Sequence, residues 1–485
     1  MCLAVQTANG SKTKQMRRKR RRKVMIIGYD SERLHHALHP LFLTINPDSR
    51  WVVGADDGKT DWYFADTGQG FVIRQGNNIK KPEADLYAVK REIYDYFYRQ
   101  ENIRLPWGII SGIRPAKLAR QIREREKIET FSDFQHKLWE IDRISPDKAE
   151  LLWEVLQTED RYLQEHGSAA GQHLYIGIPF CPSRCYYCSF AAGVVGTGDD
   201  RLGQYVRLLG RELAELKELW QEKPLRTVYI GGGTPTVLSE DLLRELLTAL
   251  AETISLNTLA EFTVEAGRPD TISPEKLDIL REFGVHRISI NPQSFSDRTL
   301  AVIGRSHTVA EVFRAYEAAK ERGFAVNMDL IFGLEGETLV DVENSFMQME
   351  KLRPDNITVH TLTPKRGADL SLRQKQAIWQ GGQGIGAMLD QWRTYMRRSG
   401  WQPYYLYRQK NIYFENVGYS LPGTECIYNM ETMLERQSVI AIGAGSISKR
   451  VEADKIRRYD MPKEWQAYRE SLAERVLQKR RFFLE

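Results

Sequence analysis

The chain has 485 residues, more than a single hydrophobic core usually organises, so two or three domains are expected. Its content of 42% apolar and 27% charged residues is that of an ordinary soluble protein. The formal net charge is +5, but nine basic residues lie between Lys12 and Lys23, and the other 60 nearly balance the 64 acidic ones. The folded part therefore carries no charge pattern of a DNA-binding surface.

Cysteine usage excludes a disulfide framework. Three of the five cysteines fall within eight residues, and the other two, Cys2 and Cys426, lie far apart. This pattern suits a reducing compartment. No apolar run reaches the ~18 residues of a membrane span, and the N-terminus lacks the apolar core of a signal peptide. We therefore expect a cytoplasmic protein.

The N-terminal part divides into a tail and a globular region. Residues 1–24 read as a basic disordered tail, or as a segment preceding a true start at Met25. Residues 25–165 predict an α+β domain, and residues 165–172 a boundary. Arg114, in an ordered loop before a helix, is a candidate for contacting a carboxylate or for structural hydrogen bonds. The pattern predicts strands at 24–28, 51–54, 62–65 and 71–74, then a helix at 88–100.

From residue 174 strand-like and helix-like patterns alternate. Six such units within 170–370 indicate a parallel, barrel-like sheet, a partial (β/α)6 barrel of the TIM type, with its site at the carboxyl ends of the strands. Residues 371–485 predict a mostly helical C-terminal domain with one helix at 377–398. The strands are expected at 174–178, 227–230, 261–265, 287–291, 326–331 and 356–360, and the helices at 202–220, 240–251, 274–283, 309–322 and 339–352.

The three clustered cysteines follow the first of these strands. Cys181, Cys185 and Cys188 have C-x3-C-x2-C spacing, which lets thiolates converge on a soft metal site. One interpretation is half of a structural zinc site, completed by Cys426 or a histidine. The other is a [4Fe–4S] cluster with one open iron, where a ligand with amino and carboxylate groups, such as S-adenosylmethionine, binds.

Polar residues and glycines mark the ends of the other strands. The turn Gly231-Gly-Gly-Thr-Pro-Thr follows the second strand, and its glycines let a ligand approach the backbone closely. Glu265 ends the third strand and is suited to accept hydrogen bonds from a cationic ligand. Gln293 follows the fourth, Asp329 lies within the fifth, and residues 360–363 end the sixth. Together they predict one ligand site.

These motifs resemble those of the radical SAM superfamily. Within it, residues 170–365 resemble the oxygen-independent coproporphyrinogen III oxidase group, and the preceding domain is most similar to its HemZ-type branch. The motifs that carry the resemblance are Tyr175-Ile-Gly-Ile-Pro-Phe-Cys181, Gly231-Gly-Gly-Thr-Pro-Thr, Arg287-Ile-Ser-Ile-Asn-Pro-Gln293, Ile303-Gly-Arg305 and Asn327-Met-Asp329-Leu-Ile-Phe-Gly333.

The resemblance implies a role for each matching residue. Cys181, Cys185 and Cys188 would ligate a [4Fe–4S] cluster. Tyr175, Gly232 and Glu265 would contact a first S-adenosylmethionine, with Ile447 as a further match. The positions that would contact a second one are Gly233, Thr234, Gln293, Arg305, Asp329 and the backbone of Thr363.

It also implies a reaction and its partners. Two propionates of coproporphyrinogen III would be oxidatively decarboxylated to vinyl groups after a 5′-deoxyadenosyl radical abstracts a hydrogen atom. A reduced flavodoxin- or ferredoxin-type protein would donate the electron. The bonding of the propionates is open: Arg305, Arg366 and Arg408 are candidates, because guanidinium groups pair with carboxylates.

Two positions depart from the oxidases of this group. Those oxidases carry a further cysteine where this chain has Phe190, and a histidine where this chain has Gly177. Haem chaperones of the HemW type share both departures, which keeps haem binding without turnover as the alternative function. Such chaperones are shorter and lack the N-terminal domain. A structural zinc protein is the third possibility.

Overall fold

The computed structural model describes residues 24–485 except 47, 55, 57, 84, 168–170, 189–192, 197, 364–381, 410–413 and 453–454. The chain forms two compact units that divide between Phe97 and Tyr98, whereas the sequence predicts a boundary near residue 165. The difference lies in three helices that pack within the second unit, α5 against α3, α4 and strand β14. The sequences of these helices indicate an apolar face, but they do not indicate which strand packs against it. They are α3 (Pro115–Arg125), α4 (Phe131–Asp142) and α5 (Pro146–His166).

The first unit is a five-stranded sheet with two helices. In the order β2-β1-β3-β4-β5, β1 is parallel to both neighbours and the others are antiparallel. Four strands and α2 lie where the sequence predicts them, and α1 and β5 are additional. The elements are β1 (Ile26–Tyr29), α1 (Glu32–Ile45), β2 (Arg50–Val53), β3 (Trp62–Asp66), β4 (Phe71–Gln75), β5 (Asn78–Glu83) and α2 (Leu86–Gln100).

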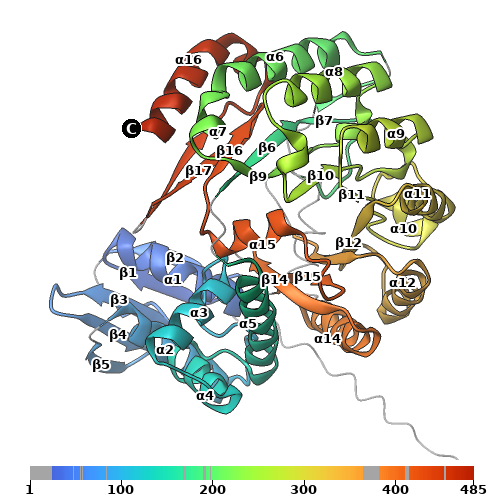
Figure 1. Cartoon of the computed structure of the whole chain (residues 1–485). Helices are drawn as coiled ribbons and strands as arrows, with labels where there is room; N and C mark the ends of the chain where they lie inside the picture. Colours follow the sequence, from blue (N-terminus) through green and yellow to red (C-terminus); the bar gives the residue numbers. More distant parts are fainter. Residues whose placement is uncertain are drawn as a thin grey trace, which may run out of the picture. The chain divides into compact units, whose positions relative to one another are not determined.

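The centre of the second unit is a parallel sheet of six strands in the order β6-β9-β10-β11-β12-β13. The helices between them follow the outside of the strands (Figure 1). This confirms the predicted partial (β/α)6 barrel. The strands are β6 (Gln172–Ile178), β9 (Leu225–Gly232), β10 (Glu261–Glu265), β11 (Arg287–Ser289), β12 (Ala325–Phe332) and β13 (Asn356–Thr361). The helices are α6 (Asp200–Leu216), α8 (Glu240–Ala251), α9 (Pro274–Glu282), α11 (Val309–Glu321) and α12 (Leu339–Leu352).

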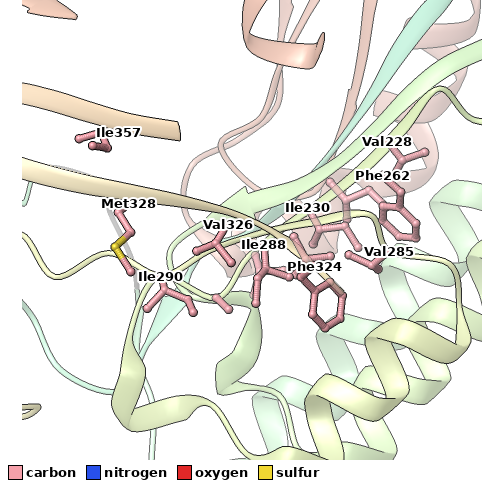
Figure 2. Close-up of a cluster of buried hydrophobic side chains, with 14 of the residues drawn as sticks. Val228, Ile230, Phe262, Val285, Ile288, Ile290, Phe324, Val326, Met328 and Ile357 are labelled. Atoms are coloured by element: carbon pink, nitrogen blue, oxygen red, sulfur yellow. The ribbon is translucent and has the colours of Figure 1, made fainter. Parts of the chain in front are cut away.

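The core of this unit lies between the strands and the surrounding helices. Alternate strand residues such as Val228, Ile230, Ile288 and Val326 are fully or almost fully buried and point to the helices (Figure 2). Because side chains alternate along a strand, the residues between them, such as Tyr229, face the barrel interior. Because of this alternation, the polar residues at the carboxyl ends of the strands point into the barrel interior together.

The C-terminal region adds strands to both edges of the sheet. β15 and β14 extend it antiparallel beyond β13, and β16 pairs in parallel with β6 before β17 and β18. Helices cover more residues of this region than strands, but its strands belong to the barrel sheet. The elements are α14 (Gly382–Ser399), β14 (Gln402–Arg408), β15 (Glu415–Ser420), α15 (Ile427–Leu434), β16 (Val439–Ile442), β17 (Ile447–Val451), β18 (Ile456–Asp460) and α16 (Trp465–Leu484).

Short elements complete the second unit. They are β7 (Phe180–Cys181), β8 (Gly193–Val194), α7 (Glu218–Glu222), α10 (Asp297–Val302) and the 3-10 turns at Pro235–Val237, Leu256–Thr258 and Pro269–Thr271. Among the described residues, no helix combines the length and the apolar character needed to cross a bilayer.

A buried histidine lies near the amino ends of the barrel strands. His173, near the start of β6, is completely buried, with Nδ1 2.8 Å from the Thr227 hydroxyl. Its Nε2 is 3.4 Å from a carboxylate oxygen of Glu431, but Arg226 and Tyr162 already bond that carboxylate at 2.7 and 2.6 Å. Burial and then the charge of Arg226 lower the pKa of His173 to about 3, so the imidazole stays neutral.

We expect this histidine to make stability depend on pH. Between about pH 6.5, where the unfolded chain binds a proton, and about 3, the unfolded state holds one more proton than the folded state. The free energy of unfolding should therefore fall by up to about 1.4 kcal/mol per pH unit as the pH decreases through this window. Urea unfolding between pH 7 and 5 should show a shallower slope for His173→Gln. Parallel slopes would contradict the assignment.

Candidate functional site

A cavity of about 350 Å³ lies at the carboxyl ends of the barrel strands, a size typical of small-molecule sites. It brings together the three clustered cysteines and nine of the ten other predicted site residues. Those nine are Tyr175, Gly232, Gly233, Thr234, Glu265, Gln293, Arg305, Asp329 and Thr363. The tenth, Ile447, starts β17 with 47% of its surface exposed and does not line the cavity.

The cysteine loop leaves the sheet directly after β6. Cys181 ends the short strand β7, and its Sγ lies 3.3 Å from Oγ1 of Thr234. The Cys188 amide donates to the Cys185 carbonyl over 3.0 Å, which turns the loop back on itself. Burial raises the pKa of Cys181, so a thiolate there needs a positive partner, which a bound metal supplies.

The spacing of the thiols fits a cluster better than a single ion. Zinc holds all its sulfurs at about 2.3 Å, so they crowd together, whereas each cysteine of a cluster binds its own iron. In the described part of the chain, only Glu32, His35 and His36 bring three ligand atoms within 4.8 Å of one another. At least one distance between the Sγ atoms of Cys181, Cys185 and Cys188 therefore exceeds 4.8 Å.

Cys426 is not placed to complete a zinc site with the other cysteines. Its thiol is fully buried and donates to Glu261 Oε1 over 3.2 Å. Glu261 begins β10, whereas Glu265 at the other end of that strand lines the cavity. The four residue steps from Glu261 to Glu265 span about 13 Å along the strand, and this length separates the Cys426 thiol from the cavity.

The glycine turn is packed against the start of the cysteine loop. Gly232 ends β9 with φ of +113°, a conformation open mainly to glycine. The amides of Gly233 and Thr234 donate to the carbonyls of Ile178 and Phe180 over 2.7 and 2.8 Å. The turn and the loop carrying Cys181 therefore form one rigid wall of the cavity.

Glu265 is held at the base of this wall. Its carboxylate accepts hydrogen bonds from the Tyr229 hydroxyl at 2.7 Å and the Gly232 amide at 3.0 Å. Burial raises its pKa, with the two hydrogen bonds acting in the opposite direction. A cationic group entering the cavity would stabilise the carboxylate, because an opposite charge offsets desolvation. The residue is thus suited to bind a cationic ligand.

Three residues that line the cavity have buried polar atoms without partners. Gln293 has φ of +65°, and its backbone bonds Asp329 and Ile331 of β12 over 2.9 Å each way. Among the described residues, Gln293 Oε1, Asn291 Oδ1 and Arg305 Nε are buried with no hydrogen-bond partner. Such atoms are costly unless satisfied, and a polar ligand in the cavity would satisfy them.

Arg305 and Asp329 are anchored by neighbours in the same cavity. Arg305 donates to the Gly267 carbonyl and to the Tyr187 hydroxyl, both over 3.0 Å. Asp329 Oδ2 lies 3.6 Å from Nε2 of His360. Thr363 turns its hydroxyl to the Thr361 carbonyl at 3.0 Å.

Arg268 and Tyr407 are two of the cavity residues that were not predicted from the sequence. Arg268 donates to Ser183 Oγ over 2.7 Å and pairs with Asp270, so it secures the cysteine loop. Tyr407, on β14, lies 3.2 Å from Nδ1 of His360. Arg268 follows Glu265 by three residues and was detectable as a strand-end residue. Tyr407 was not, because no local pattern indicates that β14 belongs to the barrel sheet.

The remaining candidates lie elsewhere or outside the described residues. Arg114 donates to the Thr432 and Met433 carbonyls and pairs with Glu435, which is a structural role. Arg408 donates to the Ile110 carbonyl over 2.6 Å and does not line the cavity. Arg366 and Phe190, and the predicted helical residues 377–381, lie outside the described residues.

Gly177 faces the turn between β16 and β17. A Cβ at this position would lie 3.4 Å from the Ile442 carbonyl oxygen and 3.7 Å from that of Ala444. Both are ordinary van der Waals distances, so the Cβ of the histidine expected in oxidases of the group would fit beside this turn.

Known proteins share this fold and much of this sequence. The model of the radical SAM superfamily matches residues 175–348. The chain is 36% identical to the oxygen-independent coproporphyrinogen-III oxidase-like protein HemZ of Bacillus subtilis, over 92% of this chain and 95% of HemZ. It is 33% identical to the haem chaperone HemW of Lactococcus lactis, over 56% of this chain and 68% of HemW. The structure of Escherichia coli HemN, described as a coproporphyrinogen III oxidase and radical SAM enzyme, matches with a TM-score of 0.50 and 22% identity, over 66% of this chain and 72% of HemN.

Proposed function

Because the chain belongs to the radical SAM superfamily and, within it, to the oxygen-independent coproporphyrinogen III oxidase-like proteins represented by HemZ, we propose that it oxidatively decarboxylates coproporphyrinogen III to protoporphyrinogen IX. Proteins of this superfamily use a [4Fe–4S] cluster and S-adenosylmethionine. The observation that carries the proposal is one cavity that brings together the three cysteines, Glu265 and the residues with unpartnered polar atoms, Asn291, Gln293 and Arg305.

The residues divide into two groups by the role that the resemblance implies for each. Cys181, Cys185 and Cys188 would hold three irons and leave the fourth to S-adenosylmethionine. Tyr175, Gly232 and Glu265 form the wall beside them and would contact this cofactor. The residues of the other group would contact either a second S-adenosylmethionine or the tetrapyrrole; they are Gly233, Thr234, Gln293, Arg305, Asp329 and Thr363.

The chain's own contribution is orientation and exclusion of water. When bound, the cluster and S-adenosylmethionine supply the one-electron chemistry that removes a hydrogen atom from the substrate. Glu265 orients a cationic group, and buried Arg305 and Gln293 present donor and acceptor atoms to polar substituents. A flavodoxin- or ferredoxin-type protein would supply the electron, and an external acceptor would remove one from the substrate.

An anaerobic turnover experiment tests the proposal. Each propionate that becomes a vinyl group loses carbon dioxide, one hydrogen atom and one electron. With reconstituted protein, reductant, S-adenosylmethionine and coproporphyrinogen III, we therefore expect at least one 5′-deoxyadenosine for each vinyl group. A sample without reductant is the control. Protein with a full cluster that forms neither product would refute the activity.

Haem binding without turnover is the second candidate. Two features favour it: the 33% identity to HemW of Lactococcus lactis and the presence of Gly177 and Phe190 where oxidases of the group carry histidine and cysteine. Titration with haem would then show tight binding of one haem per chain, while coproporphyrinogen III stays unchanged in the turnover experiment.

A further inference from the structure

A fully buried ion pair joins the C-terminal helix α16 to helix α6. Lys479 Nζ donates to Glu212 Oε1 over 2.6 Å, and both side chains have no exposed surface. Lys479 also donates to the Ala441 carbonyl of β16 over 2.5 Å, and Glu212 Oε2 accepts from the Tyr468 hydroxyl at 2.6 Å. Removing two charges from water offsets much of their attraction, so such a pair is weak evidence for stability and better evidence for a positional role.

The ion pair leads to the turn between β16 and β17, which packs on the end of β6. Glu212 Oε2 accepts from the Gly443 amide over 3.0 Å. The Tyr205 hydroxyl donates to the Gly177 carbonyl at 2.7 Å and accepts from the Ala444 amide at 2.8 Å. Gly443 has φ of +92°, and a Cβ there would lie 2.5 Å from the Gly177 oxygen. The Tyr205 hydroxyl thus links the turn between β16 and β17 to the end of β6.

This strand end supports both halves of the cofactor wall. Gly177 lies between Tyr175, whose side chain lines the cavity, and Cys181. The next carbonyl groups, of Ile178 and Phe180, accept the amides that fix the glycine turn. A displacement of Gly177 would therefore also displace Cys181 and the glycine turn beside Glu265.

We infer that α16 and α6 support the cofactor site from behind: Lys479, Glu212 and Tyr205 act as positioning residues that hold the end of β6 for binding S-adenosylmethionine. The inference rests on the proposed function only in its use of this cofactor, not in the identity of the tetrapyrrole. It assigns a role to residues that touch neither the cavity nor a predicted ligand.

The sharpest test is Tyr205→Phe, which removes one oxygen atom from a fully buried ring. With the cluster reconstituted anaerobically and no tetrapyrrole present, equilibrium dialysis measures the dissociation constant of S-adenosylmethionine. We expect it to rise roughly five- to tenfold, the effect of one or two lost hydrogen bonds, while iron and sulfide content stay near those of the unchanged protein.

The matched control is Tyr162→Phe. Tyr162 is also buried and donates a 2.6 Å hydrogen bond, to Glu431, but Glu431 and its partner His173 lie at the amino ends of the strands. Both variants should lose a similar few degrees of melting temperature, and only Tyr205→Phe should bind S-adenosylmethionine more weakly. Equal dissociation constants in both variants and the unchanged protein would show that the network serves stability alone and would overturn the inference.

A second pair of variants tests the helix itself. Lys479→Met should weaken S-adenosylmethionine binding at least as much as Tyr205→Phe, whereas Arg480→Gln should not. Arg480 also pairs α16 with a carboxylate, Glu218, but that pair lies on the surface and does not reach the turn. If Lys479→Met fails to fold, Tyr205→Phe decides alone. Absence of S-adenosylmethionine binding in the unchanged protein would instead overturn the proposed function.

Discussion

Replacing any one of Cys181, Cys185 or Cys188 by alanine should abolish retention of the [4Fe–4S] cluster. Three thiolates are all that this loop supplies, so each loss leaves two ligands for four irons. Iron and sulfide per chain after anaerobic reconstitution should fall to background, and 5′-deoxyadenosine formation should drop well beyond the ~100-fold typical of changes around a metal site. A variant that keeps its cluster would show that the lost cysteine is not a ligand.

Cys426→Ala provides the matched control for this loss. The Cys426 thiol is fully buried against Glu261, so its removal should cost about 1–2 kcal/mol of the free energy of unfolding. Cluster content and 5′-deoxyadenosine formation should remain unchanged. Zinc without sulfide in the purified protein, together with loss of that metal in Cys426→Ala, would instead require a site of four cysteines.

The barrel was predictable because its signals are local. Each strand is an apolar run, and four of the six end in a polar or glycine residue. Helices α8 and α12 have the bounds that the sequence predicts, 240–251 and 339–352. Serine and threonine caps mark their starts: Ser239 accepts from the Leu242 amide, and Thr338 forms a reciprocal capping box with Asp341. Periodicity and caps are properties of short segments, so one sequence reveals them.

Strand pairings and helix contacts between segments that lie far apart in the sequence were not predictable. β14 contains an aromatic stretch and β16 leads into a small-residue turn, but neither pattern indicates that these strands pair with β15 and β6. The packing of α5 against β14 was not predictable either, because the sequence of α5 is that of an ordinary amphipathic helix. α1 was missed for another reason: its buried leucines repeat at helical spacing, but three histidines and Pro40 obscure the pattern.

The candidate site followed from topology and chemistry together. The carboxyl ends of parallel strands meet at one edge, so six strand-end residues could be assigned to one cavity without coordinates. The lysine and glutamate behind Gly177 carried no such signal, because they lie in helices more than 260 residues apart. Ile447 matches a motif by position only, and such a match carries no information on which way the side chain faces.

Gly233→Ala should disable the cofactor site through a steric clash. A Cβ at Gly233 would lie 2.4 Å from the Phe180 carbonyl oxygen and 2.9 Å from that of Ile178. Both are backbone atoms, so neither can rotate away, and the turn or the loop carrying Cys181 must shift. Overpacking of this kind costs about 1–3 kcal/mol of the free energy of unfolding. Cluster content and S-adenosylmethionine affinity should both fall, because the clash separates the glycine turn from the loop carrying Cys181, which together form the wall that binds these cofactors.

A matched glycine separates this clash from the general effect of adding a methyl group. Gly210, in the middle of α6, would place a Cβ 3.5 Å from that of Ala249, an ordinary contact. Gly210→Ala should therefore keep the cluster and gain up to about 1 kcal/mol of helix stability. Gly233 itself has no positive φ, so a loss confined to Gly233→Ala reflects the close approach of Phe180 and not backbone strain. If both variants bind S-adenosylmethionine as tightly as the unchanged protein, the wall formed by Gly233 and Phe180 plays no part in holding it.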